Sequence, residues 1–162
     1  MNKEIMHRNL IDFKDVMDRH NVRFVFIFGT LLGVVRGGDL IDWDNDVDTA
    51  CFRPDRDRMP GVIEDMRKLG FAIIQYPEVP EHDINFKRNG EKIETWWFED
   101  KDSEWYYDER IRYKKDYFNN TDSINFLGRS WEVPSNKEDF LTLTYGSDWR
   151  IPDPNKSYII GA

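Results

Sequence analysis

The chain has 162 residues and a formal net charge of −8, with 31 acidic and 23 basic side chains. This length is enough for a domain with a buried core, and we expect residues 1–162 to form one domain. Proteins that bind nucleic acid usually neutralise phosphates with clustered lysine and arginine, so the acidic balance argues against general nucleic-acid binding. The single cysteine, Cys51, excludes an intrachain disulfide.

The sequence gives no sign of a membrane segment. No stretch approaches the roughly 18 consecutive apolar residues of a membrane-spanning helix. The first residues, Met1–Met6, lack the apolar region of a signal peptide. We therefore expect a soluble, cytoplasmic protein.

The N-terminal part predicts a helix, a buried strand and a turn. Apolar residues recur at close to helical spacing over Lys3–His20, which indicates an amphipathic helix covering a sheet. Val22–Phe28 is β-branched and aromatic, as in a buried strand. Gly29 permits a sharp turn, and Thr30 is expected to cap a short helix over Leu31–Arg36. The N–H groups of such a helix start could hold a phosphate.

A row of carboxylates follows that turn. Residues two apart share one face of a strand, so Asp46 and Asp48 should point the same way, with Val47 in the core. Asp42 and Asp44 continue the row if the strand begins early. Carboxylates crowded on one face repel one another unless a cation lies between them, and hard oxygen ligands suit Mg²⁺, Mn²⁺ or Ca²⁺.

Three interpretations of this row compete. It could be a solvated acidic loop. It could be a calcium loop of the EF-hand type, but counting from Asp42 or Asp44 gives neither the glycine nor the glutamate that this loop requires. The third is a Mg²⁺ site for phosphoryl or nucleotidyl transfer, which the preceding Gly29-Thr30 turn favours.

The middle of the chain predicts a helix, a strand and a hairpin. Asp55–Leu69 has helical spacing, although Pro60-Gly61 inside it allows a kink or a late start. Phe71–Gln75 is expected to be a short strand, followed by a loop over Pro77–Pro80. His82–Lys87 and Lys92–Phe98 should pair as a hairpin across an Asn-Gly turn.

The last third contains a basic cluster and a second hairpin. The cluster consists of Arg110, Arg112, Lys114 and Lys115; it could bind donor phosphates or form a solvated helix face. Ser123–Leu127 and Ser130–Val133 predict a hairpin across Gly128-Arg129. A helix over Lys137–Tyr145 should follow, with Ser135 and Glu138 as a capping box.

Two motifs together resemble a known family. The chain is similar to the LicD and fukutin-related family of the polymerase-β-like nucleotidyltransferase superfamily. The residues that carry the resemblance are Gly29-Thr30-Leu31-Leu32-Gly33 with Arg36, then Ile41, Trp43, Asp44 and Asp46-Val47-Asp48, and near the end Tyr145-Gly146 with Pro152. Asp42 departs from the pattern, because a proline is usual before this tryptophan.

The resemblance implies the fold class and the chemistry. It implies an α/β (α+β) nucleotidyltransferase-like fold, in which helices flank a mixed sheet. It also implies a site for Mg²⁺ or Mn²⁺, and transfer of a phospho-alcohol from a CDP-linked donor to a glycan. Phosphocholine and ribitol phosphate are examples of the transferred group.

The resemblance also implies roles for single residues. Asp46 and Asp48 would hold the metal, and Glu94, on a later strand, would be the third ligand and help to deprotonate the acceptor. Gly29 and Thr30 would cradle phosphate. Two of these residues have simpler alternatives from the sequence alone. Glu94 could face solvent, and Arg36, expected to neutralise phosphate, could instead pair with a nearby carboxylate.

Two rival functions remain open at this point. One is a nucleotidyltransferase that moves a nucleoside monophosphate from a nucleoside triphosphate to a small molecule, a protein or a nucleic acid. The other is a nucleotide-binding module without turnover. The same core motif serves all of these functions, so the motif alone does not choose between them.

Overall fold

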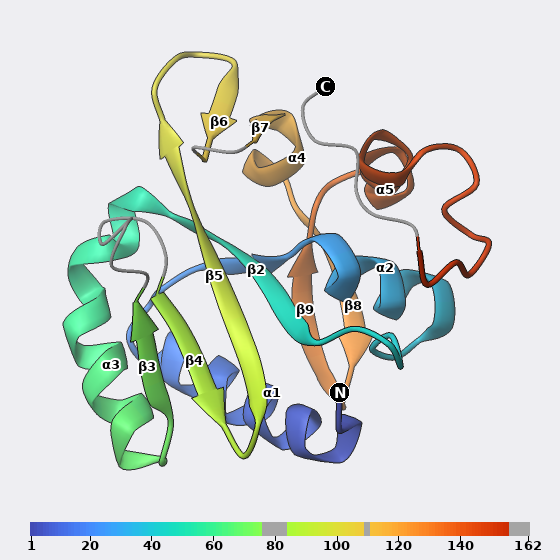
Figure 1. Ribbon diagram of the computed structural model, residues 1–162. Coiled ribbons are helices and arrows are strands. Elements are labelled where there is room, and N and C mark those ends of the chain that lie inside the picture. Colours follow the sequence, from blue (N-terminus) through green and yellow to red (C-terminus); the bar gives the residue numbers. More distant parts are fainter. Residues whose placement is uncertain (76–83, 109–110, 156–162) are drawn as a thin grey trace.

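The computed structural model describes residues 1–75, 84–108 and 111–155. Its helices and strands, drawn in Figure 1, are α1 (Lys3–Arg19), β1 (Phe24–Phe26), α2 (Phe28–Gly37), β2 (Asp46–Phe52), the 3₁₀ helix η1 (Arg53–Arg58), α3 (Met59–Lys68), β3 (Ala72–Gln75), β4 (Ile84–Arg88), β5 (Glu91–Asp100), β6 (Trp105–Tyr107), β7 (Arg112–Lys114), α4 (Asp116–Asn119), β8 (Asp122–Phe126), β9 (Arg129–Val133) and α5 (Lys137–Tyr145). The loop predicted over Pro77–Pro80 lies outside the described residues.

The main sheet is mixed. Its strands follow the order β1-β2-β5-β4-β3, and β6 pairs with the far end of β5 and with β7. Only the central pair, β2 and β5, is parallel among the pairings of the described residues. The predicted mixed sheet with flanking helices is therefore confirmed.

The parallel pair separates a core face from a face that carries charge. Its register sets Asp46 beside Lys92 and Asp48 beside Glu94. The alternate residues Val47 and Ile93 are fully buried. Because side chains alternate along a strand, the apolar and the charged residues lie on opposite faces of the sheet.

Helix α1 covers the apolar face. Phe13 makes edge-to-face and tilted ring contacts with Phe24 of β1 and Phe86 of β4. The side chain of Asn2 caps the helix by accepting a hydrogen bond from the N–H of Ile5. Figure 1 shows α1 and α3 beside the sheet, as the helical spacing predicted for both segments.

The second hairpin packs against β1 and forms a separate two-stranded sheet. Trp131 of β9 stacks on Phe26 of β1 with ring centroids 4.7 Å apart, and its indole N–H donates to the carbonyl of Phe126. Leu127 and Gly128, both with positive φ, make the turn. The predicted hairpin is thus confirmed, with its turn one residue earlier than expected.

The helix predicted over Asp55–Leu69 begins late. A 3₁₀ helix occupies Arg53–Arg58, and the α-helix starts at Met59 with Pro60 in its first turn. Proline is tolerated there because the first-turn N–H groups have no partner within the helix. Of the two effects expected from Pro60-Gly61, a kink or a late start, the structure shows the late start.

The basic cluster does not form a helix face, which corrects that alternative. Arg112 and Lys114 belong to β7, and both lie over the ring of Trp105 in β6, with the Arg112 guanidinium 4.7 Å from its centroid. Lys115 pairs with Asp100. Alternating polar and aromatic residues suit a strand pair more than a helix. Arg110 lies outside the described residues.

The predicted capping box is also wrong. The N-cap of α5 is Asn136, in the left-handed region and without a side-chain capping bond. Ser135 instead donates its hydroxyl to the carbonyl of Asp116, and Glu138 pairs with Arg150. The hydroxyl of Ser135 therefore binds α4 and does not cap α5.

No helix within the described ranges has both the length and the apolar character needed to cross a membrane.

Cys51 is fully buried, and burial raises the pKa of its thiol. A buried thiol that is hard to ionise is a packing residue.

Candidate active site

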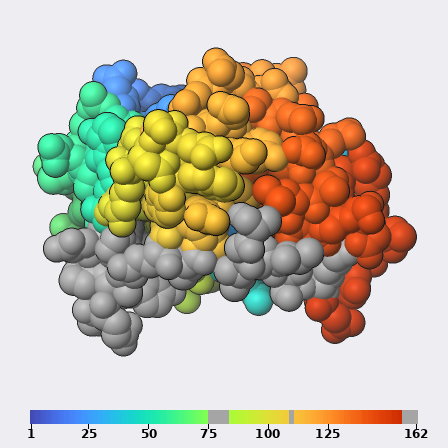
Figure 2. Space-filling view, turned by 90° about the horizontal axis from the view of Figure 1, so that it is seen from above, coloured from blue at the N-terminus to red at the C-terminus, as the bar shows by residue number. Residues whose placement is uncertain are grey.

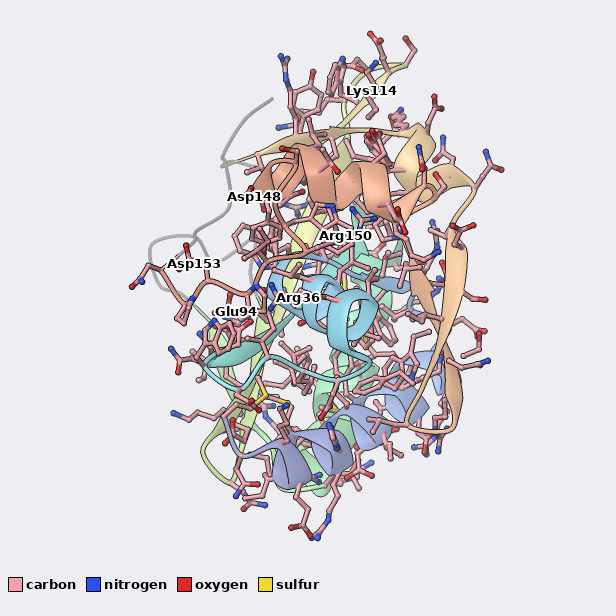
Figure 3. All side chains as sticks on the ribbon, turned by 90° about the vertical axis from the view of Figure 1, so that its right-hand side faces the viewer. Arg36, Glu94, Lys114, Asp148, Arg150 and Asp153 are labelled. Atoms are coloured by element: carbon pink, nitrogen blue, oxygen red, sulfur yellow. The ribbon has the colours of Figure 1, made fainter. Side chains whose placement is uncertain are left out.

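A pocket of about 330 Å³ opens on the charged face of the β2–β5 pair. It is built by α2, the loop leading into β2 and the start of β2, the middle of β5, and the end of α5 with the chain after it. Its lining residues include Phe28, Gly29, Leu32, Arg36, Trp43, Asp44, Asp46, Asp48, Glu94, Trp96, Tyr145, Trp149, Ile151 and Asp153. Figure 3 labels Arg36, Glu94 and Asp153 on this side of the molecule.

The first turn of α2 departs from the prediction. The helix already begins at Phe28, so Thr30 lies inside its first turn and is not its N-cap; Ile27 is the N-cap. The hydroxyl of Thr30 accepts a hydrogen bond from the N–H of Asp48 at 2.8 Å. Thr30 is 1% exposed, so its side chain fixes α2 to β2 instead of facing a ligand.

Gly29 lies against the carboxylate of Asp44. A Cβ added at Gly29 would lie 2.1 Å from Asp44 Oδ2, so the carboxylate can approach this closely only because residue 29 has no side chain. Asp44 precedes β2 but lines the pocket; burial, followed by the charge of Asp46, raises its pKa. A carboxylate therefore lies beside the helix start, where the resemblance placed a phosphate.

Asp42 is not part of this pocket. Its side chain is 80% exposed and pairs with Lys3 at 2.6 Å. Of Asp42 and Asp44, which continue the acidic row in the sequence, only Asp44 lines the pocket. The reason is that β2 begins at Asp46 and the preceding loop turns Asp42 outward.

Asp46, Asp48 and Glu94 lie together in the pocket. The indole N–H of Trp96 donates to Asp48 Oδ1 at 3.0 Å. Burial raises the pKa of Asp48 well above its usual range, and the charges of Asp46 and Glu94 act in the same direction. The side chain of Glu94 is 17% exposed, which excludes the alternative of a solvent-facing strand residue.

Lys92 holds two of these carboxylates. Its ammonium lies 3.1 Å from Asp46 Oδ2 and donates a hydrogen bond to Glu94. Burial opposes its charge, but the contacts with Glu94 and Asp46 outweigh burial and raise its pKa. Lys92 was not among the predicted site residues, although its position two residues before Glu94 puts it on the same strand face.

The donor set suits a hard divalent cation, although its present arrangement does not form a metal site. Five carboxylates line the pocket: Asp44, Asp46, Asp48 and Glu94 come from β2, β5 and the loop before β2, and Asp153 comes from the chain after α5. Carboxylate oxygens are the ligands that Mg²⁺ and Mn²⁺ prefer. Among the described residues, no three acidic, histidine or cysteine side chains are gathered closely enough to hold a metal ion as they stand.

Arg36 contributes positive charge to the same pocket. Its Nη1 donates to the carbonyl of Trp149 at 3.3 Å, and its guanidinium lies 6.0 Å from the Trp43 ring centroid. Within the described part of the chain, no carboxylate forms an ion pair with Arg36. The salt-bridge alternative is therefore not observed.

The rim of the pocket is apolar and partly exposed. Trp43 is 44% exposed and Ile151 is 65% exposed, and both line the pocket. Such surfaces can stack on a base or a sugar ring. Ile151 and Asp153 were not among the predicted site residues, because nothing in their local sequence shows that the chain after α5 returns to α2.

The basic cluster lies away from this pocket. Figure 3 shows Lys114 at one end of the molecule, well separated from Arg36 and Glu94. Arg112, Lys114 and Lys115 are not among the pocket-lining residues. Figure 2 looks from above onto the end of the molecule that carries the β5–β6 connection (yellow). This connection lies between the segment around η1 (teal) and the C-terminal third (orange to red).

The sequence matches a family of known transferases. The family model described as LicD/FKTN/FKRP, nucleotidyltransferase domain, matches residues 21–136. Ribitol 5-phosphate transferase FKRP of mouse and of human are each 25% identical to the chain over 150 residues, which is 81% of this chain. The match spans 29% of the length of each of these relatives.

Solved structures share the fold. A crystal structure of ANT(2″)-Ia in complex with adenylyl-2″-tobramycin superposes with a TM-score of 0.59 at 12% identity, covering 85% of this chain and 75% of that chain. A solution structure of the antibiotic-resistance factor ANT(2″)-Ia gives 0.58 at 10% identity, covering 82% and 66%. At these identities the likeness establishes the fold alone.

Proposed function

We propose that this chain, which belongs to the LicD/FKTN/FKRP nucleotidyltransferase-domain family, is a metal-dependent phosphotransferase. Its donor would be a CDP-linked alcohol, and its acceptor a hydroxyl group of a glycan or another sugar-containing molecule. The printed name of the FKRP relatives, ribitol 5-phosphate transferase, supports a phospho-alcohol as the transferred group.

One observation carries this proposal. A single pocket combines the carboxylates of its β2 and β5 region with the guanidinium of Arg36, which among the described residues has no carboxylate partner. A polyphosphate donor with its metal ion needs both kinds of group, because the metal needs oxygen ligands and the phosphate needs a cation.

Each site residue then has a role. Asp46, Asp48 and Glu94 would hold Mg²⁺ or Mn²⁺, which when bound offsets the negative charge of the donor and of the leaving group. Arg36 would bind a phosphate oxygen, and Gly29 would keep the first turn of α2 open to the donor. The exposed ring of Trp43 would stack on a ring of the donor or acceptor.

The bond changes follow from these roles. The acceptor hydroxyl oxygen forms a bond to the phosphorus that carries the alcohol, and the bond from that phosphorus to the bridging oxygen breaks. CMP leaves with the bridging oxygen and its electron pair. Glu94 is the carboxylate proposed to accept the hydroxyl proton, which requires its present contact with Lys92 to open.

Nucleotidyl transfer is the second candidate. The fold is shared with ANT(2″)-Ia, whose crystal structure contains adenylyl-2″-tobramycin. In this reaction a nucleoside triphosphate would lose pyrophosphate and leave its nucleotide on the acceptor. The same carboxylates would serve both reactions, so the donor decides between them. The third possibility is a nucleotide-binding module without turnover.

A donor screen tests the proposal. Thermal shift is measured with CDP-ribitol, CDP-choline, ATP, CTP, GTP and UTP, each with MgCl₂, and any hit is followed by product analysis. We expect CDP-alcohols to raise the melting temperature and CMP to be the nucleotide product. The Asp48→Asn variant is the control and should form no product. Pyrophosphate release with nucleotide left on the acceptor would replace the leading proposal by nucleotidyl transfer. Binding without any product would favour the module.

A further inference from the structure

We propose that Lys92 is a built-in counter-ion, which holds Asp46 and Glu94 while no metal is bound and which a divalent cation must displace. This inference rests on the proposed function, because it takes these two carboxylates to be metal ligands. The inference adds that Lys92 competes with the metal ion for the carboxylates of Asp46 and Glu94.

The contacts of Lys92 support this assignment. Its Nζ lies 3.1 Å from Asp46 Oδ2 and donates to Glu94, so one ammonium bridges carboxylates from two strands. The parallel register sets Lys92 directly beside Asp46, and Glu94 follows two residues later on the same face. The side chain of Lys92 is only 27% exposed, so water screens these contacts less than it would on the open surface.

The charge balance of the pocket shows why such an ion is needed. Asp44, Asp46, Asp48 and Glu94 all line the pocket. Within the described ranges, Lys92 is the one basic side chain that forms an ion pair with any of them. Without it, neighbouring carboxylates would repel one another across a partly buried space.

The geometry has a consequence for metal binding. Asp46 and Glu94 can share a cation only if the ammonium leaves, because it already occupies the position between them. The metal therefore gains its ligands at the cost of an ion pair within the protein. Replacing Lys92 by a neutral residue should remove this competition and tighten metal binding.

The test measures Mn²⁺ affinity by electron paramagnetic resonance and by calorimetry, without any donor. We compare the wild type with Lys92→Met, Lys92→Gln and Lys92→Arg. The matched control is Lys68→Met, since Lys68 also bridges two carboxylates, Glu64 at 2.9 Å and Asp65 at 3.1 Å, but lies on α3.

We expect both neutral variants to bind Mn²⁺ about tenfold more tightly, the order of effect expected for one nearby charge in a partly screened site. Lys92→Arg and Lys68→Met should keep the wild-type affinity. Without metal, Lys92→Met and Lys92→Gln should melt at lower temperatures than the wild type, because their carboxylates lack a counter-ion. Two neutral variants are used so that the test stands if one of them fails to fold.

Two results would overturn the inference in distinguishable ways. If Mn²⁺ binds the wild type and the neutral variants with equal affinity, or the variants more weakly, Lys92 is not a competitor and the proposed function still stands. If Mn²⁺ binds none of the proteins, the metal-dependent function fails together with this inference.

Discussion

Gly33 and Gly29 of α2 have different neighbours, so substituting them should have different effects. Gly33 matters for the stability of the fold, and Gly29 matters for the shape of the pocket. A Cβ at Gly33 would lie 2.6 Å from the backbone oxygen of Asp39 and 3.0 Å from the backbone nitrogen of Ile41. A Cβ at Gly29 would instead meet the end of the Asp44 side chain. A backbone cannot rotate away from a new methyl group, whereas a carboxylate can.

Gly33→Ala should therefore destabilise the fold by about 1–2 kcal/mol, since overpacking against the backbone outweighs the better helix propensity of alanine. Gly29→Ala should change the free energy of unfolding by less than about 1 kcal/mol but move Asp44 and weaken donor binding. Urea denaturation with a donor-binding assay measures both effects. Equal destabilisation by the two substitutions would contradict this distinction.

At the scale of elements, α2 and β2 are joined by a buried hydrogen bond. The hydroxyl of Thr30 accepts from the N–H of Asp48, and these residues are 1% and 9% exposed. Because Asp48 lies on β2 and lines the pocket, this bond sets where the carboxylate row lies relative to the first turn of the helix.

Thr30→Val should cost about 1–3 kcal/mol, because it keeps the shape of the side chain but leaves a buried N–H without its acceptor. Thr30→Ser keeps the acceptor and loses only a methyl group, about 1 kcal/mol. Hydrogen exchange of the Asp48 amide separates the two causes: it should speed up relative to the wild type in the valine variant only. Faster exchange in the serine variant alone would contradict the assigned bond.

At the scale of the whole molecule, the net charge of −8 means that any added salt can stabilise the protein by screening. Specific binding of Mg²⁺ must be distinguished from this general effect. At equal ionic strength, we expect MgCl₂ to raise the melting temperature more than NaCl does. By mass action the gain is about 2.7 kcal/mol when the metal is at about 100 times its Kd.

Asp46→Asn and Asp48→Asn should each remove most of the extra gain from MgCl₂ and leave the NaCl effect unchanged. Asp42→Asn is the matched control, because Asp42 belongs to the same acidic segment but lies outside the pocket. Equal shifts with the two salts, or a metal effect that survives both pocket substitutions, would show that the stabilisation is screening alone.

Local pattern was enough to predict much of the fold. The spacing of apolar residues predicted α1, and the alternation around Val47 predicted β2 and its buried face. Turn residues predicted the hairpin of β8 and β9. These predictions succeed because each depends on residues that are close in sequence, where periodicity and turn chemistry act directly.

The tertiary structure alone decided how these parts meet. The parallel register of β2 and β5 brings Glu94 and Lys92 to the Asp46–Asp48 row from a segment more than 40 residues away. The chain after α5 adds Trp149 and Ile151 to the pocket, and contacts between elements redirect Thr30 and Ser135 from capping to other partners. The sequence by itself singled out Asp46 and Asp48 as candidate site residues, because residue types and their spacing are local. Only packing determined the counter-ion, the apolar rim and the hydrogen bond that holds the row, because pairing between distant segments depends on the whole core.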